Sequence, residues 1–252
     1  VPGCPHGKVR PCPEAFCPGI AREMVIPDPG TVFVAADLSQ AEARVVAYLA
    51  RETRLLAVFN SGGDIHRRNA AVMFRKPEAD VTAVERYLAK RVVHASNYGM
   101  GPHKFATVAG VPLAEAKSLL NQYFATYPRI KVWHLEIEET LRRTRTLTTP
   151  LGRRRQFFGA WGDDLVREGL AYIPQSTVSD ILNSGLVQYF HQGCGDILLQ
   201  IHDSIMIQVP PEQVPQAQAD LVRYLTRPVV IGDSECTIPV DCKVGSNWNE
   251  LA

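Results

Sequence analysis

The sequence has no apolar run long enough to cross a bilayer and no signal-peptide pattern at its start, so neither membrane insertion nor secretion is indicated. Its six cysteines do not form a dense disulfide framework, which favours a reducing, cytoplasmic setting. The formal net charge is only +1, so total charge indicates no partner and only local clusters of charge can do so. The sequence contains no internal repeat and no low-complexity tract.

The apolar content is sufficient for a folded protein. With 252 residues, of which 46% are hydrophobic, the chain can bury one large core or two small ones. It begins at Val1, without Met, in a proline-rich stretch. We therefore expect a fragment of a longer protein.

The first 30 residues hold seven prolines and three cysteines and show no periodic pattern. Cysteine and histidine side chains are close enough in the sequence to supply four zinc ligands, namely Cys4, His6, Cys12 and Cys17. Their spacing matches no standard zinc finger. Two interpretations therefore remain, free thiols in a loop within residues 1–21 or a structural zinc site.

A helix with one polar side is predicted between Thr82 and Gly101. Thr82 and Glu85 have the spacing of a capping box, and Gly99, Gly101 and Pro102 end the helix. Four polar side chains recur at every fourth residue and therefore lie along one side, namely Arg86, Lys90, His94 and Tyr98. Cations spaced along a rod suit a chain of phosphates, and flat rings suit a base. A solvated face with two incidental rings is the alternative.

Two aspartates stand at the ends of predicted strands. The run from Thr31 to Ala36 is typical of a buried strand and is followed by Asp37, after which Ser39 and Glu42 predict a capped helix. Residues 197–201 and 205–209 predict a tight hairpin with His202, Asp203 and Ser204 at its tip. Two carboxylates so placed suit two Mg²⁺ ions about 4 Å apart. Helix capping and turn formation are the alternatives.

Arginines gather in the middle of the chain. Helices are predicted at 113–126, 128–145 and 164–190, and a hairpin with a Pro-Leu-Gly turn at 147–158. Six arginines surround this hairpin, namely Arg142, Arg143, Arg145, Arg153, Arg154 and Arg155. Such crowding in a nearly neutral protein indicates binding to a polyphosphate backbone, with a solvated charge run as the alternative.

Three stretches resemble the A, B and C motifs of family A DNA polymerases, the bacterial DNA polymerase I group, in a phage-like form. They are DLSQAEARVVAYLA (37–50), RYLAKRVVHASNYGMG (86–101) and LLQIHDSIMIQV (198–209). Supporting matches are DIH (64–66), TPLGRRR (149–155), R-x7-Q (167–175) and VGSNW (244–248). They follow the family's order and cover nearly the whole chain from Arg22 onward, which makes the resemblance specific.

The resemblance implies the roles of individual residues in template-directed nucleotidyl transfer from a dNTP to a primer hydroxyl. Asp37 and Asp203 match the catalytic carboxylates that hold two Mg²⁺ ions, with the Leu38 carbonyl as a further ligand. Lys90 matches the proton donor to pyrophosphate. The residues that match positions holding the incoming triphosphate are Gln40, His66, Arg86 and Lys90.

The resemblance also implies how the sugar and the DNA are contacted. Glu42 matches the steric gate against ribose, beside Tyr98. Arg167, Gln175 and His202 match residues that touch the primer–template minor groove, where correct base pairs present common acceptors. We expect the arginines of the hairpin, Arg153, Arg154 and Arg155, to bind DNA as well.

Three positions depart from the family pattern. His94 replaces the usual Phe or Tyr that stacks on the nucleotide, and an imidazole can also donate a hydrogen bond. Ala171 replaces an Asn, and Ser204 replaces the Glu that usually follows the catalytic Asp. None removes a metal ligand, so we expect altered sugar discrimination, rate or fidelity.

The resemblance implies an α+β fold with an antiparallel palm sheet and helical fingers. Residues 1–61 and 161–252 would form the palm, residues 62–160 the fingers, and the thumb would lie outside this chain. Closure of the Arg86–Tyr98 helix on a correct pair would be the fidelity step. The expected partners are primer–template DNA, dNTPs and an unidentified processivity or replisome partner, in the cytoplasm of a bacterium or phage-infected host.

Two other functions remain open. A single-subunit RNA polymerase shares the aspartates of the A and C motifs, but Glu42 argues against it, because a gate against ribose is useless to an enzyme that needs ribose. A nucleic-acid-binding fragment without catalysis is the second alternative.

Overall fold

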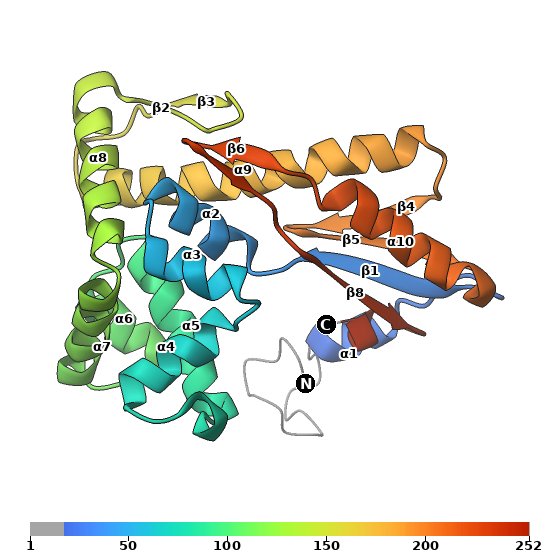
Figure 1. Cartoon of the computed structure of the whole chain (residues 1–252), viewed down its shortest axis with the longest axis horizontal. Helices are drawn as coiled ribbons and strands as arrows, with labels where there is room; N and C mark the ends of the chain where they lie inside the picture. Colours follow the sequence, from blue (N-terminus) through green and yellow to red (C-terminus); the bar gives the residue numbers. More distant parts are fainter. Residues whose placement is uncertain (1–17, 252) are drawn as a thin grey trace. The chain divides into compact units, whose positions relative to one another are not determined.

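The computed structural model describes residues 18–251, which form two compact units (Figure 1). Unit 1 contains the chain up to Ser39, Ser179–Val229 and the chain from Thr237, and unit 2 contains Gln40–Val178 and Val230–Cys236. These boundaries differ from the predicted palm and fingers ranges, and the palm and fingers assignment stays a prediction. No helix in the described residues is long and apolar enough to cross a membrane.

Unit 1 is built on a four-stranded antiparallel sheet with the strand order β4-β5-β1-β8. The strands are β4 (Ile197–Ile201), β5 (Ser204–Val209), β1 (Val32–Leu38) and β8 (Val240–Gly245). The predicted α+β fold with an antiparallel sheet that carries both aspartates is confirmed. β1 is longer than its predicted range and includes Asp37.

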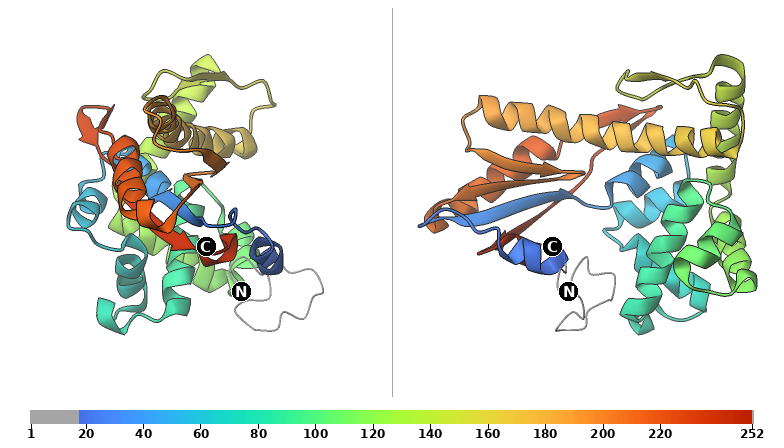
Figure 2. Two further views of the ribbon diagram at one scale, coloured as in Figure 1. Left: turned by 90° about the vertical axis from the view of Figure 1, so that its right-hand side faces the viewer. Right: turned by 180° about the vertical axis from the view of Figure 1, so that it is seen from behind.

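The two faces of this sheet pack against different elements. Phe33 packs with Met206 and Leu251 on one face, where η3 (Trp248–Leu251) lies beside α1 (Pro18–Glu23). The alternate residues of β1, Val34 and Ala36, point to the other face and are fully buried. Figures 1 and 2 show α10 (Val214–Leu225) along β1 and β8, which it contacts. A short turn, η2 (Pro211–Gln213), precedes α10.

Unit 2 is helical except for two short hairpins, and α9 continues from it into unit 1. Its helices are α2 (Ala41–Leu49), α3 (Thr53–Asn60), α4 (Ile65–Phe74), η1 (Glu78–Asp80), α5 (Ala83–Asn97), α6 (Pro102–Ala109), α7 (Leu113–Thr126), α8 (Pro128–Thr144) and α9 (Asp163–His191). The hairpins are β2 (Thr146–Thr148) with β3 (Arg154–Gln156) and β6 (Val229–Ile231) with β7 (Ser234–Cys236).

Most of the predicted elements of unit 2 are present. The structure confirms the helices predicted at 113–126, 128–145 and 164–190, whose ends differ from the prediction by no more than one residue. It also confirms the hairpin predicted at 147–158. The sequence pattern predicts Ser39 as the N-cap of α2, and this prediction is wrong by one residue. Gln40 occupies the N-cap in the left-handed region, with φ of 53°, and its side chain makes no capping hydrogen bond. The Ser-x-x-Glu pattern does not reveal this conformation, because it depends on the backbone between β1 and α2.

A buried polar network holds the end of α5 against α7 and α8. The Tyr123 hydroxyl donates a hydrogen bond of 2.7 Å to Asn97 Oδ1. His134 Nε2 lies 3.0 Å from the Asn97 carbonyl oxygen, to which it donates. Burial lowers the pKa of His134 to about 4, against the opposing effect of this hydrogen bond. His134 is therefore neutral in the folded protein at neutral pH.

We predict that this network makes the protein acid-sensitive. In the unfolded chain a histidine has a pKa of about 6.5 and is protonated below that pH. In the folded protein His134 stays neutral until about pH 4. Stability is therefore fully present above pH 6.5 and falls by up to about 1.4 kcal/mol per pH unit as the pH drops toward 4. Denaturant unfolding at pH 7 and pH 5 measures this loss. The variant His134→Gln should lose less stability between these pH values than the wild type, whereas the exposed control His191→Gln should match the wild type. Equal losses in all three proteins would contradict the assignment.

Candidate functional site

In unit 1, the sheet brings the two predicted catalytic aspartates together. Ile201 pairs with Ser204, so the hairpin loop between β4 and β5 consists only of His202 and Asp203. Asp37 on β1 pairs with Ser204 on β5, and the Leu38 N–H donates a 3.0 Å hydrogen bond to the Asp203 carbonyl oxygen. The two aspartates, 166 positions apart in the sequence, are thus one ladder position apart in space. The predicted pairing of Asp37 with Asp203 is consistent with this arrangement.

The loop between β4 and β5 is a tight two-residue turn. His202 takes a positive φ of 57°, as the first residue of a two-residue hairpin loop commonly does, although glycine or asparagine would do so at less cost. The side chains of Asp37 and His202 are exposed, and that of Asp203 is half-buried. The backbone therefore presents these polar side chains at the end of the sheet.

Sequence reasoning missed a third acid at the same place. Asp241 on β8 pairs with Asp37 from the side opposite to Ser204, and directly paired residues of an antiparallel ladder point to the same face. Both carboxylates are exposed. Only the strand order β5-β1-β8 reveals this neighbour, because nothing in the local sequence around Asp241 distinguishes it from a surface acid.

The donor groups at this end of the sheet fit Mg²⁺. Asp37, Asp203 and the Leu38 carbonyl offer hard oxygen ligands, which this ion prefers. No group of three or more His, Cys, Asp or Glu side chains among residues 18–251 is placed to enclose a metal. Mg²⁺ usually binds through one or two carboxylates and completes its shell with water and substrate phosphates, so Asp37 and Asp203 would suffice as its carboxylate ligands. The predicted zinc ligands Cys4, His6, Cys12 and Cys17 lie outside the described residues.

In unit 2, Asp64 organises the predicted triphosphate-binding groups. Its Oδ1 accepts hydrogen bonds from the backbone N–H groups of His66 (2.9 Å) and Arg67 (3.1 Å), which caps α4. Its Oδ2 accepts from Arg86 Nε at 2.6 Å. Burial alone would raise the pKa of Asp64, but the hydrogen bonds from Arg86 and the two backbone groups lower it below its ordinary value. One carboxylate thus fixes both the start of α4 and the side chain of Arg86.

His66 lies within this group of charges as a neutral imidazole. It is 6% exposed, and its Nδ1 has no hydrogen-bond partner among the described residues. Burial lowers the pKa of His66 to about 4; the Asp64 charge opposes this shift, and Lys90, Arg86 and His94 add to it. His66, Arg86, Lys90 and His94 therefore share one electrostatic environment.

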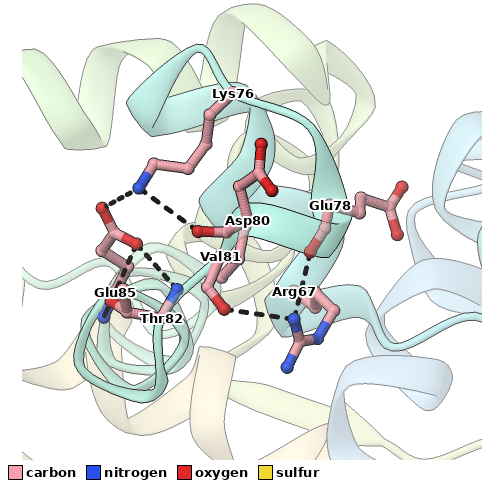
Figure 3. Close-up of polar contacts among 7 residues, drawn as sticks. All are labelled: Arg67, Lys76, Glu78, Asp80, Val81, Thr82 and Glu85. Atoms are coloured by element: carbon pink, nitrogen blue, oxygen red, sulfur yellow. Dashed lines mark hydrogen bonds and ion pairs between the residues drawn. The ribbon is translucent and has the colours of Figure 1, made fainter.

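The beginning of α5 is fixed by a set of polar contacts (Figure 3). The predicted capping box is confirmed, since Thr82 Oγ1 accepts from Glu85 N at 3.2 Å and Glu85 Oε2 accepts from Thr82 N at 2.8 Å. Lys76 forms an ion pair of 2.6 Å with Glu85. These bonds from Lys76 and Thr82 lower the pKa of Glu85 to about 2. Nearby, Arg67 donates to the carbonyl oxygens of Glu78 and Val81 and so holds the connection that leads into α5.

A cavity of about 670 Å³ borders α5 in unit 2 and collects several of the predicted residues. Lys90, His94 and Tyr98 line it, and the rings of His94 and Tyr98 have centroids 6.0 Å apart. Arg167 and Ala171 of α9 also line this cavity. Arg167 makes an ion pair with Asp164, one turn earlier on α9. Three of the four residues on the predicted polar side of α5 therefore border a cavity with charged, aromatic and apolar walls, and Arg86 is not among its lining residues.

Two of the predicted site residues, Gln40 and Glu42, lie at the start of α2. Gln40 Oε1 accepts a hydrogen bond of 3.3 Å from Ile65 N, which links the start of α2 to the start of α4. Glu42 is 9% exposed, in the first turn of α2. Gln40 therefore contacts the same turn that carries His66.

The other predicted DNA-binding residues of unit 2 are not among the residues that line this cavity. Arg153, Arg154 and Arg155 are exposed on the hairpin of β2 and β3, and Gln175 is exposed on α9. Sequence reasoning missed two exposed rings beside these arginines, Phe158 and Trp161. The sequence contained a signal for them, since aromatic residues begin two positions after the arginine run ends at Arg155.

Comparisons with known proteins identify the family of this chain. Residues 16–250 match the sequence profile of DNA polymerase family A. DNA polymerase I of Deinococcus radiodurans is 36% identical over 241 residues, which cover 90% of this chain and 24% of that protein. The thermostable DNA polymerase I of Thermus aquaticus is 31% identical over 241 residues, which cover 89% of this chain and 27% of that protein.

A solved structure shares the fold. The POL domain of Pol1 from M. smegmatis, in complex with DNA primer-template and dNTP, has a TM-score of 0.81 at 24% identity and matches 91% of this chain and 42% of that chain. The chain spans about a quarter of the length of the curated relatives that it matches. Since the family profile extends over almost all of its residues, the chain belongs to DNA polymerase family A.

Proposed function

We propose that this chain carries the nucleotidyl-transfer site of a template-directed DNA polymerase. The observation that supports this most directly is the position of Asp37 beside Asp203 across the β1–β5 ladder. In the proposed reaction the primer 3′ oxygen forms a bond to the α-phosphorus of a dNTP, and the bond to pyrophosphate breaks. The relatives named DNA polymerase I, and the related domain in complex with primer-template DNA and dNTP, support the same assignment.

The carboxylates of unit 1 would hold the metal ions. We assign Asp37, Asp203 and the Leu38 carbonyl as ligands of two Mg²⁺ ions, which when bound stabilise negative charge on the attacking and leaving oxygens. The ladder fixes the backbone at both aspartates through hydrogen bonds, so only their side chains would have to adjust to bind metal. In this proposal the unit 1 sheet is the core of the palm.

The cationic groups of unit 2 would bind the triphosphate. Arg86 is held by Asp64, so its guanidinium is oriented before the nucleotide arrives. Lys90 supplies a second cation and a proton for the departing pyrophosphate. His66, neutral and buried, would donate one N–H to a phosphate oxygen without adding charge, and Gln40 lies at the same turn. In this proposal α5 belongs to the fingers.

The sugar, the base and the DNA would be contacted by the other predicted residues. Glu42 and Tyr98 would exclude a ribose hydroxyl, and the ring of His94 would stack on the nucleotide. Arg167, Gln175 and His202 would contact the minor groove, and Arg153, Arg154 and Arg155 the phosphate backbone. The proposed setting is phage or bacterial DNA replication.

We predict that removal of one carboxylate abolishes synthesis. In the full-length protein, Asp37→Ala should lower the rate of primer extension at least about 1,000-fold, since the metal site supplies several kcal/mol of transition-state stabilisation. Asp233→Ala, at an exposed turn of unit 2, is the matched control and should retain the wild-type rate. Unchanged extension by Asp37→Ala would favour a non-catalytic DNA-binding module, and preference for rNTPs over dNTPs would favour an RNA polymerase.

We predict that Asp64 acts by orienting Arg86. Asp64→Ser retains a good N-cap for α4 but loses the ion pair, so the KM for dNTP should rise about 5-fold while the unfolding free energy changes little. In the double variant Asp64→Ser, Arg86→Lys, the loss of binding free energy for dNTP, calculated from KM, should be smaller than the sum of the losses in the two single variants, because both residues act through one pair. Steady-state kinetics measures this, and an unchanged KM in Asp64→Ser would contradict the role.

We predict that His94 affects sugar discrimination. If its imidazole donates a hydrogen bond to the incoming nucleotide, His94→Phe should increase discrimination against dideoxynucleotides about 5- to 10-fold, the effect of one hydrogen bond. Competitive incorporation of ddNTP and dNTP measures the ratio. Tyr87→Phe changes another ring that lines the cavity and should leave the ratio unchanged. The same ratio in His94→Phe and wild type would refute this role.

A further inference from the structure

The C-terminal end of α5 carries Tyr98, which lines the cavity of unit 2. The last four carbonyl groups of a helix have no partner within the helix and must find one elsewhere. In α5 the first three of these accept hydrogen bonds of 2.8 to 3.2 Å from the backbone N–H groups of residues 98–100. The fourth, the Asn97 carbonyl, accepts from His134 Nε2 of α8 at 3.0 Å. The end of α5 is therefore attached to another helix at the residue that precedes Tyr98.

The side chain of Asn97 makes a second attachment, to α7. Asn97 is 4% exposed, and its Oδ1 accepts the 2.7 Å hydrogen bond from the Tyr123 hydroxyl. Tyr123 is 1% exposed, and the rings of Phe124 and Tyr127 pack edge-on against it with centroids 5.7 and 5.1 Å from its own. Burial raises the pKa of Tyr123, so its hydroxyl stays protonated and remains a donor. A tyrosine fixed in the core thus holds Asn97.

The residue after Tyr98 is also held closely. Gly99 takes a φ of 65°, which glycine adopts without steric cost. A Cβ atom at Gly99 would lie 3.0 Å from Leu170 Cδ1 of α9, so the backbone approaches that helix tightly. Tyr98 therefore lies between two residues whose positions are set by α7, α8 and α9. Its ring centroid is 6.0 Å from that of His94, which lines the same cavity.

We propose that Asn97, held by Tyr123 and His134, is a positioning residue for Tyr98 and so for the exclusion of ribonucleotides. Asn97 is not among the residues that line the cavity, so it acts through the neighbouring ring. Hydrogen bonds are directional, whereas apolar contacts are not, so this polar network restricts the rotation of the helix end more narrowly than hydrophobic packing would. The role rests on the proposed function, in which Glu42 and Tyr98 exclude a ribose hydroxyl.

The ratio of rNTP to dNTP incorporation by the full-length protein tests this role. Tyr123→Phe and His134→Phe each remove one donor to Asn97, and each should raise the ratio about 3- to 10-fold, the effect of one hydrogen bond. A variant that is merely less folded loses both activities equally, so its ratio does not change. Tyr189→Phe removes a 3.0 Å hydrogen bond from a buried tyrosine of unit 1 and is the matched control, which should keep the wild-type ratio.

Two further variants separate positioning from stability. His134→Gln retains an N–H donor and should keep the ratio close to that of the wild type, whereas His134→Phe should not. The double variant Asn97→Leu, Tyr123→Phe removes both partners of the side-chain hydrogen bond. Since neither partner is then left buried and unpaired, the unfolding free energy should change little. The ratio should still rise, because the direction that the hydrogen bond imposed on the helix end is lost.

The same assay distinguishes failure of this role from failure of the proposed function. A wild-type ratio in Tyr123→Phe, in His134→Phe or in the stable double variant would overturn the role of Asn97 while the polymerase assignment stands. An equal rise in His134→Gln and His134→Phe would also overturn it, because the donor would then not be the cause. Wild-type protein that incorporates rNTPs as readily as dNTPs would instead overturn the proposed exclusion of ribose, and the role of Asn97 with it.

Discussion

The register of β1 against β5 positions the two aspartates of unit 1. In this register Asp37 pairs with Ser204, and the Leu38 N–H meets the Asp203 carbonyl. A slip of one residue would turn Asp37 to the face of the sheet on which Val34 and Ala36 are buried. The alternation of buried and exposed residues on β1 therefore places the Asp37 side chain on the exposed face, so the packing of the core and the position of this carboxylate have the same cause.

In unit 2, contacts with fixed partners likewise determine the positions of the basic side chains. Asp64 is the counterion of Arg86 and at the same time the cap of α4, so the cation and the helix that carries His66 are positioned together. His66 remains neutral because it is buried among cations. The result is a group of basic and imidazole side chains with limited self-repulsion, attached to helices that the core holds in place.

Much of the framework was predictable because it depends on local patterns. The Thr82–Glu85 capping box, the buried strand before Asp37 and the short link at His202 and Asp203 each follow from a few neighbouring residues. Asp241 could not be predicted, because its nearness to Asp37 depends on β8 pairing with β1. The left-handed conformation of Gln40 and the double role of Asp64 also depend on contacts between distant segments. The exposure of Phe158 depends on Phe157 taking the buried position.

The central claim, that Asp37 and Asp203 bind one metal cluster, is tested most directly by Mn²⁺ binding followed by electron paramagnetic resonance in the presence of dNTP. The account predicts that Asp37→Ala and Asp203→Ala each lose the bound Mn²⁺ signal to about the same extent as the double variant, because the two carboxylates act as one site. Independent, additive losses, or wild-type Mn²⁺ binding in either single variant, would contradict it.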